Sequence, residues 1–260
     1  MEGSVHSHYV AGFVAQARRR RWNFSLLEFR GCGEEFNRAP RLYHSGETTD
    51  LGLAVTLLLE RATQTGLFLA GVSLGGNVLL KWLGENGDEI PKGIRGAAAV
   101  SVPFDLEAGA RILQRGFARI YDRHFLRSLR AKALRKLDQF PGLFDRERLA
   151  RAESIEDFDD AVTGPVHGFA GSHDYYQRSS SIHFIERIRV PTLLLSSADD
   201  PFLPPAVLDR VRQIAPNNPN LRLVFTEAGG HVGFVSGRIP FRPRFWAEDR
   251  VMSFFDSFVS

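Results

Sequence analysis

Four features that this sequence lacks or has little of limit the classes of protein it can encode. A single cysteine, Cys32, excludes any disulfide within the chain, and the lack of an apolar run of about 18 residues argues against a membrane-spanning helix. The first residues also lack the basic and apolar regions of a signal peptide. Charge of one sign is not in large excess, because a net charge of +3 is too small to identify nucleic acid or a membrane as a partner. These features predict a soluble, cytoplasmic protein.

Short apolar segments alternate with helical patterns along most of the chain. Each apolar segment is hydrophobic enough to form a strand buried on both faces, which is typical of a parallel sheet with crossover helices. The predicted strands are residues 24–29, 67–72, 96–102, 192–197 and 221–226. The predicted helices are residues 8–20, 50–62, 74–84, 205–214 and 247–258. With 260 residues the chain can form one α/β domain around a doubly wound, mostly parallel sheet.

Residues 107–189 interrupt this alternation, because they are helical in pattern and contain no clear buried strand. We interpret them as a helical cap inserted into a core made of residues 1–106 and 190–260. The first half of the cap carries arginine at every fourth position, namely Arg111, Arg115, Arg119, Arg123 and Arg127. A basic amphipathic helix that contacts anionic lipid is one interpretation. The sequence favours an ordinary cap helix with a solvated basic face, since the apolar face is equally needed for docking on the core.

The segment Gly71-Val72-Ser73-Leu74-Gly75-Gly76 joins a predicted strand directly to a predicted helix. A nucleophile elbow needs small residues around its serine, because the sharp turn holds that residue in a strained conformation with its hydroxyl exposed. Gly71 and Gly75 meet this need. A bare Gly-x-Ser-x-Gly motif occurs by chance in about one chain in ten of this length, so the flanking elements carry the prediction. We predict Ser73 as a nucleophile, and a glycine-rich packing turn is the alternative.

A serine hydroxyl needs a base to accept its proton, and His231 follows the last predicted strand. It lies in Glu227-Ala228-Gly229-Gly230-His231-Val232-Gly233, where glycines leave room for an imidazole to approach the serine. The other seven histidines are mostly in helical or cap contexts. A structural histidine is the alternative, but the order of the elements favours a catalytic base.

A carboxylate in the loop after residues 192–197 would accept the imidazole N–H and fix its tautomer. Asp199 and Asp200 both occupy this loop, directly before Pro201. One of the two is then the orienting acid, and the other is a turn or capping residue. With either aspartate the chain order is serine, aspartate, histidine, which is the order of this kind of triad in α/β sheets.

Several further motifs resemble the YheT-like branch of the α/β-hydrolases, the group that includes the eukaryotic abhydrolase-domain lipases and the yeast medium-chain ester synthases/esterases. The matching segments span nearly the whole chain and include the elbow, Asn37-Arg38, Asp174-Tyr175-Tyr176, and residues 29–33 (FRGCG), 43–48 (YHSGET), 101–106 (SVPFDL), 156–160 (EDFDD), 199–202 (DDPF) and 229–234 (GGHVGF). The resemblance implies an α/β-hydrolase fold with a helical cap. The family's spacing from the end of the strand to the acid favours Asp200 as the orienting acid, with Asp199 as a turn or capping residue. It also implies that Arg30, Asn37, His44 and Glu47 brace loops around the site, in a segment that contains Cys32.

The same resemblance implies an oxyanion hole built from two backbone N–H groups. One belongs to Leu74, directly after the serine, and the other to a His-Gly-x-x-Gly loop whose tail aligns with residues 1–4, so Met1 is its nearest counterpart. Relative to the family the chain is then truncated at its N-terminus and lacks the first three strands. Two hypotheses follow: a longer protein exists, or this chain is a non-catalytic remnant.

The sequence as a whole predicts a serine hydrolase that cleaves carboxylic esters through an acyl-enzyme. The resemblance implies short to medium acyl chains, with acylglycerols or other lipid esters as substrates. Acyl transfer to an alcohol on the same three residues is the alternative within this class. No cofactor, metal or nucleic acid is expected, and peripheral contact of the basic cap with anionic membrane is a further expectation on partners.

Overall fold

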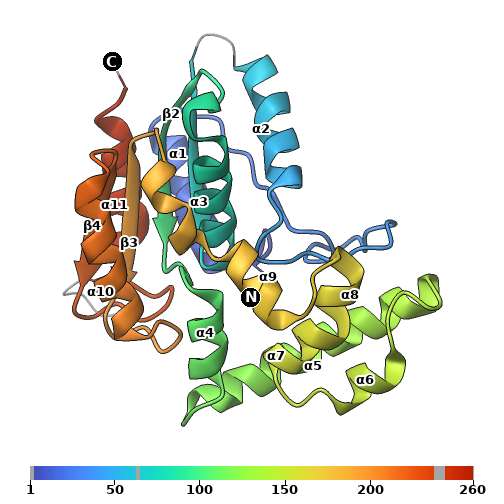
Figure 1. The fold of residues 1–260 in the computed structure, drawn as a ribbon. Coiled ribbons are helices and arrows are strands. Elements are labelled where there is room, and N and C mark those ends of the chain that lie inside the picture. The colour runs from blue at the N-terminus through green and yellow to red at the C-terminus, as the bar shows by residue number, and fades with distance from the viewer. Residues whose placement is uncertain (1–2, 63–64, 237–243, 260) are drawn as a thin grey trace.

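The structure, a computed structural model, describes residues 3–62, 65–236 and 244–259. A parallel sheet of four strands forms its centre, in the order β1-β2-β3-β4 (Figure 1). The strands are β1 (Leu67–Val72), β2 (Ile94–Val100), β3 (Thr192–Ser197) and β4 (Leu221–Thr226). Because all four run in one direction, the loops that follow them meet at one edge of the sheet.

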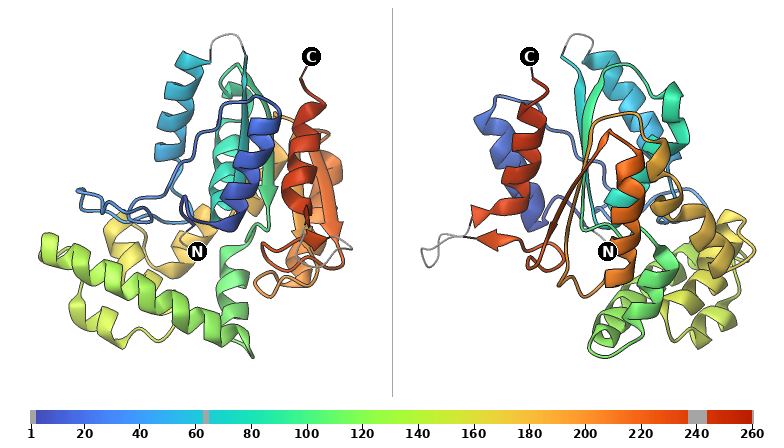
Figure 2. Two further views of the ribbon diagram at one scale, coloured as in Figure 1. Left: turned by 180° about the vertical axis from the view of Figure 1, so that it is seen from behind. Right: turned by 60° about the vertical axis from the view of Figure 1, so that its left-hand side comes forward.

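Helices cover both faces of this sheet (Figure 2). One face packs against α1 (His8–Arg19) and α11 (Trp246–Asp256), and the other against α2 (Thr49–Arg61), α3 (Leu74–Asn86) and α10 (Pro205–Ile214). In β2, Ala97 and Ala99 pack on the face covered by α2, α3 and α10, whereas Ala98 and Val100 pack on the face covered by α1 and α11. This alternation follows from the period of two along a strand, and burial on both faces confirms the predicted doubly wound sheet.

Three of the predicted strands have the predicted ends, and the predicted helices of the core agree to within two residues. The strand predicted at 96–102 ends at Val100, because Ser101 has a φ of 53° and turns the chain out of the sheet. Short 3₁₀ helices lie at Gly87–Glu89, Ser181–His183, Ile185–Arg187 and Ala215–Asn217, and the two-residue strands β5 (Val235–Ser236) and β6 (Arg244–Phe245) form a small antiparallel pair.

The predicted strand at residues 24–29 is wrong. These residues form no strand and no helix, and Phe24, Leu26 and Leu27 are exposed. No backbone N–H of residues 24–29 donates a hydrogen bond within the described part of the chain. A strand needs a neighbour to bond its N–H and C=O groups, and β1 has only β2 beside it among the residues described. Apolar composition alone therefore did not produce a strand here.

The helices between β2 and β3 gather at the carboxyl edge of the sheet (Figure 1). They are α4 (Leu106–Leu113), α5 (Ala118–Gln139), α6 (Arg146–Arg151), α7 (Ile155–Phe158), α8 (Gly164–His167) and α9 (Ser172–Ser179), with a π-helical turn at Asp159–Thr163. Several share a separate apolar cluster that includes Leu126, Leu137, Leu149, Phe158 and Val162. We propose that residues 107–189 form the cap, although Ile182, Ile185 and Ile188 pack within the cluster on the sheet.

None of the helices in the described ranges combines the length and hydropathy needed to cross a bilayer. The longest, α5, spans 22 residues but is rich in arginine and lysine.

Candidate active site

Ser73 occupies the sharp turn between β1 and α3. Its φ of 53° and ψ of −122° lie in a region that residues with a side chain rarely adopt. The turn is fixed by the Ser73 N–H, which donates to the Val100 carbonyl at 2.8 Å, and by the Ser73 carbonyl, which accepts from the Gly76 N–H at 2.9 Å. Such strain, held by surrounding hydrogen bonds, is the geometry expected of a nucleophile elbow.

The glycines of the elbow are required at Gly71 and Gly76. A Cβ added to Gly71 would lie 2.5 Å from the Gly75 carbonyl oxygen, and one added to Gly76 would lie 2.7 Å from Val102 Cγ2. A Cβ at Gly75 would meet no atom within 4 Å. The sequence predicted Gly71 and Gly75 as the small residues that the turn needs, whereas the close approaches occur at Gly71 and at Gly76, one position after Gly75.

His231 reaches Ser73 from the turn that follows β4. Its Nε2 lies 2.8 Å from the Ser73 Oγ, and its Nδ1 lies 2.7 Å from Asp200 Oδ2. In the tautomer protonated at Nδ1, the ring donates to Asp200 and accepts the Ser73 hydroxyl proton. Residues separated by 158 positions in the chain are thus joined through one imidazole.

Asp199 and Asp200 have separate partners. The Asp200 carboxylate is fully buried, and its Oδ1 accepts from the Phe202 N–H at 2.9 Å, which directs Oδ2 to His231. Asp199 Oδ1 accepts from the Ser197 hydroxyl and from the Gly229 and Gly230 N–H groups. Its pKa is lowered by these bonds, with that from Ser197 the largest cause. Asp199 therefore ties the loop after β3 to the loop that carries His231.

The glycines before His231 do not simply leave room for its ring. A Cβ at Gly229 would lie 2.5 Å from the Phe234 ring, and Gly230 has a φ of 63°. These residues allow the loop to turn and to pack closely, while their N–H groups bond Asp199.

Leu74 is the first residue of α3, so its N–H has no partner within the helix. The N-terminus of a helix also carries partial positive charge, which suits a developing oxyanion beside Ser73. Met1, the other expected donor, lies outside the described residues.

Sequence reasoning missed Phe202, which connects the cap to the proposed base. The Phe202 ring meets the His231 ring edge-on at a centroid distance of 4.6 Å. Tyr121 and Phe125 of α5 contact the same ring at 5.0 and 6.0 Å. The position of Phe202 two residues after Asp200 was a signal available in the sequence, but its contacts depend on where the cap lies.

Asn77, buried in α3, was also missed. Its side-chain amide donates to the Ser45 and Ser179 carbonyls at 2.8 Å each and accepts from the Ser181 N–H at 2.9 Å. The elbow helix is thereby joined to the 43–48 segment and to the return from the cap. The available signal was an asparagine among the apolar residues of a predicted buried helix, because a buried polar side chain needs hydrogen-bond partners.

The segment expected to brace the site does make bracing contacts. The Arg30 guanidinium forms two bonds with Asp50, at 2.6 and 2.5 Å, and Asn37 bonds the Arg41 carbonyl and the Ala39 N–H within its own loop. Lys136 of α5 donates to the carbonyl oxygens of residues 37 and 39. The loop is therefore held from both the core and the cap.

His44 and Glu47 lie in the adjacent stretch of the same segment. Glu47 accepts from the Thr49 N–H and pairs with Arg41. The His44 Nε2 lies 3.6 Å from the Glu47 Oε2. Burial lowers the pKa of His44 to about 3, and burial lowers the pKa of His167, whose ring is 4.4 Å away, to about 4. Both rings are neutral at neutral pH, so their contact brings no charge repulsion. Cys32 closes a turn by donating its N–H to the Phe29 carbonyl.

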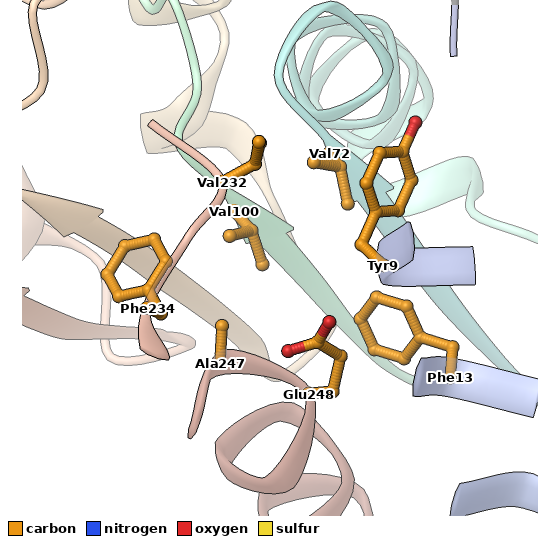
Figure 3. A pocket seen from close by; sticks show the side chains of 8 residues that line it. All are labelled: Tyr9, Phe13, Val72, Val100, Val232, Phe234, Ala247 and Glu248. Atoms are coloured by element: carbon orange, nitrogen blue, oxygen red, sulfur yellow. The ribbon is translucent and has the colours of Figure 1, made fainter. Parts of the chain in front are cut away.

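A small void lies directly behind the elbow (Figure 3). Its volume is about 10 Å³, and it is lined by Val72 and Val232, the neighbours of Ser73 and His231, with Tyr9, Phe13, Val100, Phe234, Ala247 and Glu248. The volume admits at most about one water, so it is a packing gap, not a substrate pocket. Helices α1 and α11 therefore support the segments that carry the two residues.

The sequence of this chain is similar to those of known hydrolases. The model of the α/β-hydrolase fold family matches residues 2–237. YheT, a candidate esterase of Escherichia coli, is 36% identical over 261 residues, covering 100% of this chain and 75% of that protein. A monoacylglycerol lipase of Saccharomyces cerevisiae is 29% identical over 249 residues, covering 92% of this chain and 54% of that protein. The chain thus spans three quarters of the bacterial relative and about half of the yeast one.

Solved structures agree with the fold. An esterase of Pyrococcus furiosus matches with a TM-score of 0.60 at 17% identity, covering 98% of this chain and 78% of that one. The α/β-hydrolase domain-containing protein 10 of mouse matches with a TM-score of 0.54 at 12% identity, covering 99% of this chain and 85% of that one. At these identities the likeness concerns the fold alone. Within the described residues, no group of three or more His, Cys, Asp or Glu side chains is arranged to hold a metal ion.

Proposed function

Because this chain belongs to the α/β-hydrolase fold family, as its motifs predicted, we propose that it is a serine hydrolase that cleaves carboxylic esters. In this proposal Ser73 is the nucleophile, His231 the base and Asp200 the orienting acid. The observation that supports it most is the pair of contacts at His231, 2.8 Å to the Ser73 Oγ and 2.7 Å to the buried Asp200 carboxylate. Both contacts are within hydrogen-bond distance, so His231 can accept the Ser73 proton while Asp200 orients the imidazole.

The proposed reaction begins when Ser73 Oγ attacks the ester carbonyl carbon while His231 Nε2 accepts the hydroxyl proton. The carbonyl oxygen becomes an oxyanion, to which the Leu74 N–H donates. Collapse of this intermediate breaks the bond to the alcohol, which leaves with the proton from His231 and gives an acyl-enzyme. Water, deprotonated by His231, then releases the acid and restores the serine. The imidazolium formed in each half is stabilised by Asp200.

The substrate class rests on the relatives. YheT is named as a candidate esterase, and the yeast relative is named for monoacylglycerol. We extend this class to the present chain and propose short to medium acyl esters, acylglycerols among them, as substrates. Product analysis with added ethanol reports whether an alcohol competes with water for the acyl-enzyme.

Steady-state hydrolysis of p-nitrophenyl esters of increasing acyl length tests the proposal. Ser73→Ala should lower kcat by about 10⁴-fold or more, because the nucleophile is lost. Ser101→Ala is a matched control, since Ser101 has the same φ of 53° at the end of the neighbouring strand and is buried with its hydroxyl making no hydrogen bond in the described structure. It should retain activity. Equal turnover by the folded wild-type chain and Ser73→Ala would contradict the proposal.

A further inference from the structure

Three large apolar side chains at the start of α5 are exposed. Phe117 is 89% exposed, Ile120 66% and Tyr121 46%. Because a helix repeats every 3.6 residues, positions 117, 120 and 121 lie on one face, and we call them the α5 stripe. The junction of α4 and α5 lies at the end of the molecule beyond the carboxyl edge of the sheet (Figures 1 and 2).

A different face of the same helix docks on the cap. Leu126, Ala133 and Leu137 are buried in the cap cluster, and Asp122 is buried beside the Ile155 N–H that it accepts from. The α5 stripe therefore lies outside the cap cluster, and of its three members Tyr121 alone makes a ring contact within the described residues, with Phe202. A contiguous exposed apolar surface of this kind marks a site of contact with a partner.

Exposed arginines flank this stripe along the chain. Arg115, Arg119, Arg123 and Arg127, which we call the arginine row, recur at every fourth position and are all exposed. Within the ranges that the structure describes, none of the four forms an ion pair. By contrast, Arg111 at the end of α4 is paired with Glu107. Charge without an ion-pair partner in the described structure therefore occurs in the same stretch of chain, residues 115–127, as the exposed apolar residues.

The surface is also close to the proposed catalytic base. Tyr121 contacts the Phe202 ring at a centroid distance of 5.0 Å, and Phe202 contacts the His231 ring at 4.6 Å. A ligand that covers the α5 stripe would thus be separated from His231 by two ring contacts.

We propose that the α5 stripe and the arginine row form a docking surface for an anionic lipid bilayer. Apolar side chains that enter the interface and basic side chains that meet lipid headgroups are the two features such binding requires. An acidic protein or a nucleic acid would engage the arginines but would leave the exposed phenylalanine and isoleucine unexplained. Docking here places the lipid surface beside His231, and that consequence for lipid-ester hydrolysis rests on the proposed function.

Vesicle sedimentation tests the binding without any turnover. The full chain is mixed with vesicles of phosphatidylcholine containing phosphatidylglycerol, and with vesicles of phosphatidylcholine alone. We expect sedimentation with the anionic vesicles and at least tenfold weaker partition to the neutral ones. Ser73→Ala should sediment as wild type, so failure of the esterase proposal and failure of the docking proposal remain distinguishable.

Paired variants separate the two contributions. Phe117→Ser with Ile120→Ser removes the exposed apolar groups, and Arg119→Gln with Arg123→Gln removes two charges, while Tyr121 is kept because it contacts Phe202. Each pair should weaken partition to anionic vesicles by about tenfold or more. Leu53→Ser is the matched control, because Leu53 is also a large apolar residue that is 61% exposed but belongs to α2, a different helix. It should sediment as wild type.

Apart from Ser73→Ala, the variants should hydrolyse a dissolved short-chain p-nitrophenyl ester at the wild-type rate, which shows that they are folded. Absence of wild-type binding to anionic vesicles would overturn the proposal. So would binding that is lost with the arginines yet unchanged in the Phe117→Ser, Ile120→Ser pair, because that result would show that charge alone attracts the chain and that the α5 stripe does not enter the interface.

Discussion

Two adjacent carboxylates, Asp199 and Asp200, point in different directions and bond different groups. Asp200 is buried and meets the His231 ring, whereas Asp199 bonds the backbone of the loop that carries that ring. Asp200 is therefore placed to orient the base, and Asp199 is placed to hold the loop that carries it.

Asp200→Asn should lower kcat by about 10⁴-fold with little change in KM, because the amide favours the tautomer with Nδ1 unprotonated and Nε2 can then no longer accept the serine proton. Asp199→Asn keeps an oxygen for the Gly229 and Gly230 N–H groups and should cost less than about tenfold. Steady-state kinetics of the two variants decides the assignment. A larger loss in Asp199→Asn would reverse it.

Asp159 in the cap is fully buried, where it accepts from the Thr163 hydroxyl at 2.6 Å and the Tyr176 hydroxyl at 2.8 Å. Burial raises the pKa of Asp159 from 3.8 to about 7. The folded chain thus holds a proton that the unfolded chain releases above about pH 4. The free energy of unfolding should accordingly fall as pH rises from about 4 to about 7.

Asp159→Asn removes this titration while keeping the size of the side chain. Its free energy of unfolding, relative to wild type, should increase by roughly 2 to 4 kcal/mol across that pH range. Urea unfolding of both proteins at several pH values measures the difference in their free energies of unfolding. Any effect of the amide that does not depend on pH adds the same amount at every pH, so it does not alter the change with pH. A difference that is independent of pH would show that Asp159 does not hold the proton.

Ser73, Asp200 and His231 could be named from the sequence because each follows a strand whose apolar pattern is strong, and parallel strands bring such positions together. Phe202 and Asn77 could not, since their roles depend on contacts with α5 and with the 43–48 segment. Such contacts arise from the path of the cap, which a local pattern does not report.

At the scale of elements, the elbow between β1 and α3 depends on close backbone approach. Gly71→Ala places a methyl group about 2.5 Å from the Gly75 carbonyl oxygen, so the turn must shift. We expect a destabilisation of about 1 to 3 kcal/mol and a loss of activity of about 10²-fold, because Ser73 moves relative to His231.

Gly75→Ala is the matched control for the elbow. Its Cβ would meet nothing within 4 Å, and alanine is the better helix former by about 1 kcal/mol, so stability should be unchanged or slightly higher. Thermal unfolding and ester hydrolysis of both variants test the pair. Equal damage at the two positions would contradict the packing described here.

The helices of the core were predictable because their apolar periodicity is strong and their ends carry ordinary signals. Residues 24–29 were mispredicted because apolar composition reports the tendency to be buried, whereas a strand also needs a bonded neighbour. Trp22 stacks on Phe68 of β1 at a centroid distance of 5.4 Å. Residues 24–29, which follow it, pair with no strand in the part of the chain that the structure describes.

For the whole molecule, the distribution of backbone bonding predicts an uneven stability. Strands β2 and β3 lie inside the sheet, and every residue of β3 is buried, whereas the backbone N–H groups of residues 24–29 donate to no group in the described ranges. Hydrogen exchange should therefore be slowest in β2 and β3 and fast throughout residues 24–29. Equal protection of the two regions would show that residues 24–29 are paired in solution.

The central claim is that His231 and Asp200 make the Ser73 hydroxyl nucleophilic. Its most direct test is mass spectrometry of the chain after treatment with a fluorophosphonate, with the adduct located by peptide mapping. The account predicts one adduct, on Ser73, formed rapidly by the wild-type chain and at least about 10³-fold more slowly by His231→Ala. A folded wild-type chain that remains unlabelled at Ser73, or that labels equally fast without His231, would contradict it.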